Sequence, residues 1–149
     1  MGGILRRRIF ISEREIGNFV AENRTLTIAS FGPNGHIHLV AMWYVVVDGQ
    51  ICFATKVKAQ KVTNLRRNPQ CSILIETGDT YDELRGVSFE GLMEISEEPE
   101  LRWKTGVNLW ERYNGPYSED VRPLVEGSLS GAPFCVSPRP GRDPGITAK

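Results

Sequence analysis

Five basic residues and no acidic one occupy the stretch TKVKAQKVTNLRRN, residues 55–68. Such a local concentration of positive charge can bind an anion such as a phosphate group. Lys58 and Lys61 are three residues apart, which places two side chains on neighbouring turns of one helix face. Thr55 adds a hydroxyl donor, and the free amide groups of a helix that begins near Ala59 favour an anion. One interpretation is therefore an anion site at Thr55, Lys58 and Lys61.

A solvated helix face is the alternative interpretation of the same stretch, and the spacing alone leaves both open. Arg66 and Arg67 stand at the far end, where cations complement the partial negative charge of a helix C-terminus. These two arginines need no ligand, and Lys56 receives no assigned role.

Other site chemistries lack the residues that they require. His36 and His38 lie two residues apart beside a turn, and no third metal ligand can be named, so we interpret them as exposed hairpin residues. The sequence contains no GxSxG, GxGxxG or P-loop motif. We therefore assign no catalytic residue and no metal ligand.

Length and charge suit one soluble domain. The chain has 149 residues, with 18 basic and 18 acidic side chains, so it has no overall field to attract nucleic acid or an anionic membrane. No apolar run approaches the roughly 20 residues of a membrane helix, and MGGILRRRIF lacks the apolar region of a signal peptide. We predict a cytoplasmic protein with one domain over residues 1–137 and a flexible tail, rich in proline and glycine, over 138–149.

Hydrophobic periodicity and turn residues divide the chain into short elements. A capping box at Ser12 and Glu15 begins the first predicted helix, and Asn68 before Pro69 ends the second. Cys52 and Cys71 fall in apolar strand-like runs, which predicts buried, reduced thiols. Strands are predicted over 24–31, 36–47, 50–55, 70–77, 87–96 and 132–137, and helices over 12–22, 59–68, 97–113 and 118–130.

These elements predict a mainly β (α+β) fold: a small antiparallel Greek-key barrel with peripheral helices. From Leu39 onward, strand 36–47 carries apolar residues on both faces. A strand of an antiparallel sheet usually has one wet face. A helix, a ligand or another subunit must cover the second face, and the pattern favours a homodimer.

The segment TLTIASFGPNGHIHLVAMWYVVVDGQICFATKVKAQKVTNLRRNPQCSILIE resembles the pyridoxamine-5′-phosphate-oxidase-like split-barrel family. Within it, the sequence is most similar to the actinobacterial branch of flavin/deazaflavin oxidoreductases that use coenzyme F420. The motifs that carry the likeness are the NG-type turn, MWY, DGQICFAT, the K…K…NLRRNP helix, VSFEG and LWERYNGPY. The resemblance covers residues 12 to 130, and the order and spacing of the motifs make it specific.

The resemblance implies a six-stranded split barrel and a homodimer with two cofactor sites at the subunit interface. It implies that the cofactor phosphate is bound by residues at the end of the third strand and the start of the next helix. Those residues are Ala54, Thr55, Lys58, Gln60, Lys61 and Asn64. It further implies a cofactor-ring pocket lined by Met42, Trp43 and Tyr44, and a substrate pocket bordered by Trp110 and Tyr113.

The implied reaction is hydride transfer from reduced F420 to an activated alkene or a related small-molecule acceptor. Two alternatives stay open: an FMN-dependent oxidoreductase of the same fold, and a non-catalytic cofactor-binding protein. The sequence departs from the branch at its end, because CVSPRPGRDPGITAK lacks the SWDH-x-KL-like segment that relatives commonly carry. Contacts that this segment makes in relatives are therefore not expected here.

Overall fold

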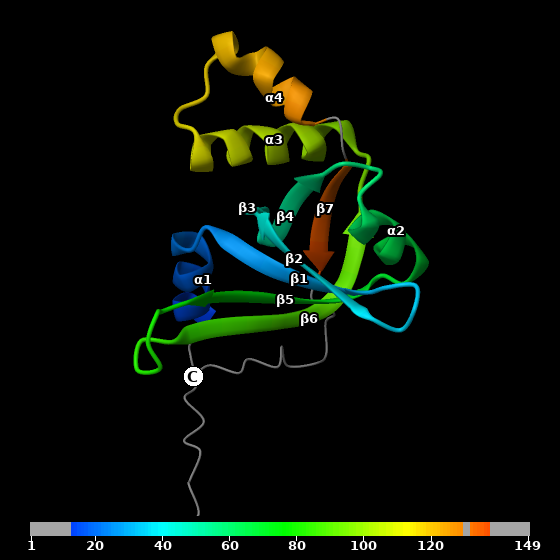
Figure 1. The fold of residues 1–149 in the computed structure, drawn as a ribbon. Coiled ribbons are helices and arrows are strands. Elements are labelled where there is room, and N and C mark those ends of the chain that lie inside the picture. Colours follow the sequence, from blue (N-terminus) through cyan, green and yellow to red (C-terminus); the bar gives the residue numbers. More distant parts are fainter. Residues whose placement is uncertain (1–12, 130–131, 138–149) are drawn as a thin grey trace, which may run out of the picture.

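A computed structural model describes residues 13–129 and 132–137 (Figure 1). This part of the chain forms seven β-strands, four α-helices and one 3-10 helix. Their bounds, in chain order, are α1 Glu13–Glu22, β1 Thr25–Phe31, β2 Ile37–Trp43, β3 Val45–Val47, β4 Gln50–Thr55, α2 Gln60–Arg67, β5 Gln70–Thr77, β6 Arg85–Ile95, α3 Pro99–Tyr113, η1 Glu119–Val121, α4 Arg122–Ser128 and β7 Ala132–Ser137.

All seven strands belong to one antiparallel sheet with the order β2-β1-β5-β6-β7-β4-β3. The two edge strands, β2 and β3, are consecutive in the chain and are separated by Tyr44 alone. The sheet must therefore curl until its edges meet at this residue. In Figure 1, α3 and α4 lie together over the β3, β4 and β7 side, and α2 lies beyond the end of β4.

The structure divides the predicted strand 36–47 at Tyr44, so the sheet has seven strands where six were expected. The physical reason lies in α3. The amide N–H of Tyr44 donates to the hydroxyl oxygen of Tyr113 over 3.1 Å, and the same oxygen lies 3.0 Å from the Tyr44 carbonyl oxygen. One side chain thus satisfies both backbone groups that a continuous strand would have paired with a neighbour.

Most other predicted elements are confirmed within two residues. β4, β5 and β7 have the predicted bounds. β6 begins two residues early, and α3 begins at Pro99 because the side chain of Glu98 caps it, accepting from the Leu101 amide over 3.1 Å. The predicted helix 118–130 is a 3-10 turn followed by α4. Ser12 of the capping box and the tail 138–149 lie outside the described residues, and the division into domain and tail stays a prediction.

Two tight turns carry the backbone conformations that their sequences require. Asp48 and Gly49, between β3 and β4, both have positive φ, 51° and 77°. This pair of angles is that of a two-residue hairpin turn whose twist matches the flanking strands. Gly35 of the predicted NG turn also has positive φ, 74°.

The main core lies between the inner face of the sheet and helices α1 and α2. β1 and β5 contribute buried residues at alternate positions, as the period of two demands. Val62 and Leu65 of α2 are buried as predicted, whereas Val57 precedes the helix and is exposed. Cys52 and Cys71 are buried, as expected. A smaller cluster of Val45, Val47 and Cys52 packs against Leu101 and Leu109 of α3.

The outer face of β1 and β2 is apolar and open. Val40 and Met42 of β2 pack on the core. Their neighbours point outward and leave large side chains exposed: Phe31 (47%), Ile37 (64%), Leu39 (65%) and Trp43 (54%). Both faces of β2 are therefore apolar, as predicted, and the residues that the structure describes leave the outer one uncovered. Beyond Tyr44 the predicted faces are wrong, because Val45 is buried and Val46 is exposed.

Candidate functional site

The start of α2 follows β4 through a tight turn. Thr55 ends β4, and the amide of Ala59 donates to the carbonyl of Lys56 over 2.9 Å. Ala59 is the N-cap and its side chain makes no capping hydrogen bond, and the first turn of α2 contains no acidic residue. The amide groups at this helix terminus carry partial positive charge. The local arrangement therefore favours an anion.

Lys61 is on the inward face of α2. Successive side chains of an α-helix are about 100° apart, so Lys61 lies between the directions of Asn64 and Leu65. Both of those residues are buried, and Lys61 itself is half-buried. Burial lowers the pKa of its ammonium group. Within residues 13–129 and 132–137, Lys61 has no ion pair with a carboxylate.

The other predicted phosphate ligands precede or follow this lysine closely along the chain. Ala54 and Thr55 are half-buried at the end of β4, and Lys58 is exposed. Lys58 lies in the turn before α2 rather than within the helix. The predicted helical spacing of Lys58 and Lys61 is therefore wrong, although the two remain close along the chain.

Gln60 and Asn64 take part in a hydrogen-bond chain to the sheet. Nε2 of Gln60 donates to Oδ1 of Asn64 over 2.9 Å, and Nδ2 of Asn64 donates to Oγ of Ser30 over 3.2 Å. Asn64 is fully buried, so its amide is engaged within the protein. Arg66 and Arg67 lie in the last turn, as predicted, and Arg67 donates to the carbonyl of Phe31 over 2.7 Å.

The three predicted ring-pocket residues do not share one face of the strand. Met42 packs against the core, Tyr44 is fully buried, and Trp43 points outward. The hydroxyl of Tyr44 donates to the carbonyl of Val20 and lies 3.1 Å from that of Asn23. Burial raises the pKa of Tyr44 to about 12. Of these three residues, Trp43 alone has a largely exposed side chain in the single chain.

Tyr113 joins α3 to the β2–β3 junction. Its ring stacks on Trp43, with centroids 4.3 Å apart and planes 5° from parallel. Its hydroxyl contacts both backbone groups of Tyr44 and the carbonyl of Arg24. The guanidinium of Arg112 lies 4.9 Å from the centre of the Tyr44 ring. Tyr113 is thus a packed and hydrogen-bonded connector.

Arg24 and Arg112 belong to this junction, although no sequence pattern selected them. The guanidinium of Arg112 donates to the carbonyls of Val20 and Asn23 at the end of α1. Arg24 donates to the carbonyl of Arg112 and lies over the Tyr113 ring at 5.7 Å. The nearest signal in the sequence was the aromatic residues of the segments MWY and ERY, because arginine side chains often pack over aromatic rings.

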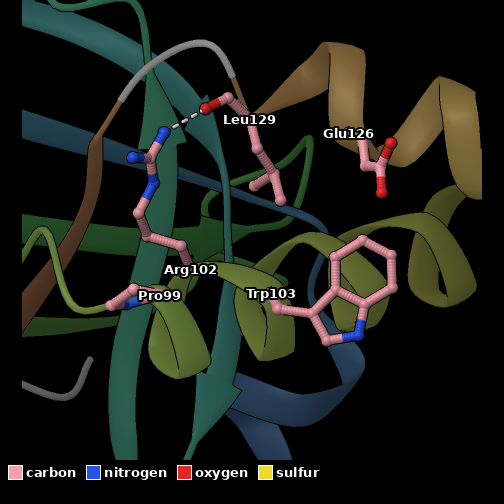
Figure 2. Close-up of a pocket in the computed structure, with 5 residues that line it drawn as sticks. All are labelled: Pro99, Arg102, Trp103, Glu126 and Leu129. Carbon is pink, nitrogen blue, oxygen red and sulfur yellow. Dashed lines mark hydrogen bonds between the residues drawn. The ribbon is translucent and has the colours of Figure 1, made fainter.

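Trp110 and Tyr113 are three residues apart on α3 and face the same side of that helix. A cavity of about 280 Å³ lies elsewhere, between α3 and α4 (Figure 2). In Figure 2, Arg102 points away from Trp103 and bonds to the Leu129 carbonyl. None of the predicted site residues lines it; its walls are Pro99, Arg102, Trp103, Glu126 and Leu129.

Two features are absent from residues 13–129 and 132–137: a metal-binding cluster and a membrane-spanning helix. No group of three or more His, Cys, Asp or Glu side chains could hold a metal ion there. His36 is exposed, and His38 is half-buried with an Nδ1 atom that has no hydrogen-bond partner. No helix in the same ranges is long and apolar enough to cross a membrane.

The sequence profile named pyridoxamine 5′-phosphate oxidase matches residues 12–130. A search of curated proteins found no match. Among solved structures, the conserved hypothetical protein Rv2991 from Mycobacterium tuberculosis is 51% identical, with a TM-score of 0.85 over 90% of this chain and 84% of that chain.

Two more distant structures share the fold. HutZ, the heme storage protein from Vibrio cholerae, is 22% identical, with a TM-score of 0.69 over 90% of this chain and 95% of its own. A protein named F420 reductase is 21% identical, with a TM-score of 0.61 over 82% of this chain and 91% of its own. At these identities the likeness concerns the fold alone.

Proposed function

We infer that this chain, which belongs to the pyridoxamine 5′-phosphate oxidase family, is a reductase that uses the deazaflavin coenzyme F420. The proposed reaction transfers a hydride from the reduced cofactor to an activated alkene, such as an enone, or to a related small-molecule acceptor. The proposal places the chain in the F420-using branch of the family. The sequence motifs that resemble this branch support that placement, and one neighbour of the same fold is named F420 reductase.

The observation that carries the proposal is the inward, half-buried position of Lys61. Burying a charge is costly unless the charge is paired. Among the described residues Lys61 has no carboxylate partner, and the adjacent helix terminus adds partial positive charge without an acid to offset it. A bound phosphate group would supply the missing negative charge. The residues present therefore fit the phosphate of F420.

In this proposal the residues at the start of α2 bind the cofactor, and those of the β2–β3 junction orient it. Lys58 and Lys61 hold the phosphate by charge-assisted hydrogen bonds, with Thr55 and Ala54 beside them. Trp43 offers an aromatic surface, and Trp110 borders the acceptor. The deazaflavin, when bound, supplies the hydride.

We also propose that the protein works as a homodimer. The exposed Phe31, Ile37, Leu39 and Trp43 form one apolar face of the sheet, and contiguous apolar faces commonly mark association sites. A second copy would cover this face and bring a second set of site residues to it. With β2 and β3 counted as one strand, the curled sheet is then the six-stranded split barrel of the family.

Some of the same observations also support two other functions. Lys61 recognises a phosphate, and FMN also carries one, so an FMN-dependent oxidoreductase is the first alternative. The second is a non-catalytic binding protein. The observation that favours it is the hydroxyl of Tyr113, which is engaged by backbone groups of Tyr44 and Arg24 and is not free to donate a proton to an acceptor.

A titration of the purified protein with oxidised F420 and with FMN, followed by fluorescence, separates these functions. Reduced F420 is then offered with a panel of enones, quinones and bilins. We expect F420 binding and turnover of at least one acceptor. Tight FMN binding without F420 binding would refute the F420 assignment, and F420 binding without any turnover would favour the binding protein.

A further inference from the structure

Asn64 is a fully buried polar side chain in the contact between α2 and the sheet. Two other helix residues in this contact, Val62 and Leu65, belong to the apolar core. A buried amide that lacks hydrogen-bond partners destabilises the fold. Its partners therefore indicate what its place in the core achieves.

The amide of Asn64 is bonded on both sides. It accepts from Gln60 in the first turn of α2 and donates to Ser30 of β1. Ser30 is itself buried, so water does not compete for this bond. Hydrogen bonds require one alignment of their partners, whereas apolar contacts tolerate several packings. The chain Gln60–Asn64–Ser30 therefore fixes how α2 sits on the sheet.

The alignment determines where Lys61 points. A turn of α2 by one residue, about 100°, in the direction that brings Leu65 opposite Ser30 would carry Lys61 away from its inward position. At the other end of the helix, Arg67 donates to the carbonyl of Phe31 and holds α2 against the same strand.

We propose that Asn64 is a positioning residue that holds α2 in the rotation that turns Lys61 inward, and that its side chain does not contact a ligand. The proposal rests on the phosphate site proposed above. It assigns Asn64 a different role from the direct cofactor contact that the family resemblance implied. Gln60 and Ser30 act with Asn64 as one unit.

The first test uses the free protein with 13C-labelled lysine side chains. NMR titration gives the pKa of Lys61, and the Lys61→Arg variant identifies its signal. We expect this pKa to rise toward its ordinary value in Asn64→Leu and in Ser30→Ala, because Lys61 then reaches solvent. Thr63→Ala, a change on the exposed face of the same helix, serves as the matched control. Ser30→Thr keeps the hydroxyl and is expected to preserve the wild-type value.

The second test measures the dissociation constant of F420, and of FMN, for the same variants. Asn64→Leu and Ser30→Ala are each expected to weaken binding about tenfold, roughly the effect of one lost buried hydrogen bond. The double variant is expected to bind the cofactor no more weakly than the weaker-binding single variant, because both changes break the same chain of hydrogen bonds.

The outcomes separate the proposals. If Asn64→Leu weakens binding while Ser30→Ala does not, Asn64 contacts the ligand directly and the positioning role is overturned. An unchanged Lys61 pKa in folded Asn64→Leu and Ser30→Ala overturns it as well. If Asn64→Leu does not fold, Ser30→Ala decides. Wild-type protein that binds neither cofactor refutes the proposed function, while the NMR titration still tests Asn64.

Discussion

The polar groups at the start of α2 differ from those at the β2–β3 junction in whether they have partners within the protein. At the junction, the hydroxyls of Tyr44 and Tyr113 are bonded to backbone groups, and the rings are stacked or covered by guanidinium groups. At α2, Lys61 is half-buried without a carboxylate among the described residues. A satisfied cluster stabilises the fold, whereas an unsatisfied charge is what a ligand completes. The comparison predicts which changes affect stability and which affect binding.

The largest effect on stability is expected for Tyr113→Ala. It removes the stack on Trp43 and the hydrogen bonds to Tyr44, so the free energy of unfolding should fall by about 3 kcal/mol. Urea denaturation measures this change. Tyr113→Phe keeps the ring and should cost about half as much. Equal stability of wild type and Tyr113→Ala would show that the junction is not structural.

Lys61→Ala is expected to affect cofactor binding rather than stability. It should weaken cofactor binding by about 1.5–3 kcal/mol, because a charge-assisted phosphate contact is lost, and it should leave the unfolding free energy unchanged or slightly higher. Fluorescence titration and urea denaturation provide the two values. Arg66→Ala, in the exposed last turn of the same helix, is the matched control. Similar small losses from both variants would indicate a solvated helix face.

Cofactor affinity should depend on pH through Lys61. Burial lowers the pKa of this lysine in the free protein, and a bound phosphate favours the charged form and raises it. Affinity is therefore constant below the lowered pKa and falls as the pH rises through it. Titrations across the alkaline range measure the decline. Lys61→Arg keeps its charge there and should remove this part of it; an identical profile in that variant would assign the decline to another group.

The smallest effect is expected for Thr105→Val, which removes a buried hydroxyl group from the protein interior. Thr105 of α3 is fully buried, and its hydroxyl has no hydrogen-bond partner within residues 13–129 and 132–137. Valine has nearly the same shape without the polar atom, so the free energy of unfolding should rise by about 1 kcal/mol. Cofactor binding should not change. A loss of stability would show that the hydroxyl has a partner after all, such as a buried water.

Local patterns predicted most of the fold. β5 follows from alternating buried residues and β4 from a short apolar run, each between turn residues, and the end of α2 follows from Asn68 before Pro69. The break at Tyr44 could not be predicted in this way, because the hydroxyl that satisfies its backbone comes from Tyr113, 69 residues later in the chain.

The candidate site shows the same limit. The basic stretch was evident in the sequence, and the position of Thr55 at the end of a strand is confirmed. The inward direction of Lys61 depends on which residues of α2 are buried, and the hydrogen bond from Asn64 to Ser30 joins residues 34 apart. The roles of Arg24 and Arg112 likewise arise only when the ends of α1 and α3 meet.

The bond between Tyr44 and Tyr113 also has a consequence for the order of folding. β1 and β2, and likewise β5 and β6, can pair as neighbouring hairpins, but the two edges of the sheet are fixed at Tyr44 only after α3 has formed and packed. Contacts between residues far apart in sequence form slowly, because a long loop must close first. Joining of the sheet edges is therefore expected late in folding, and the Trp43–Tyr113 stack places a fluorescent side chain where that last step occurs.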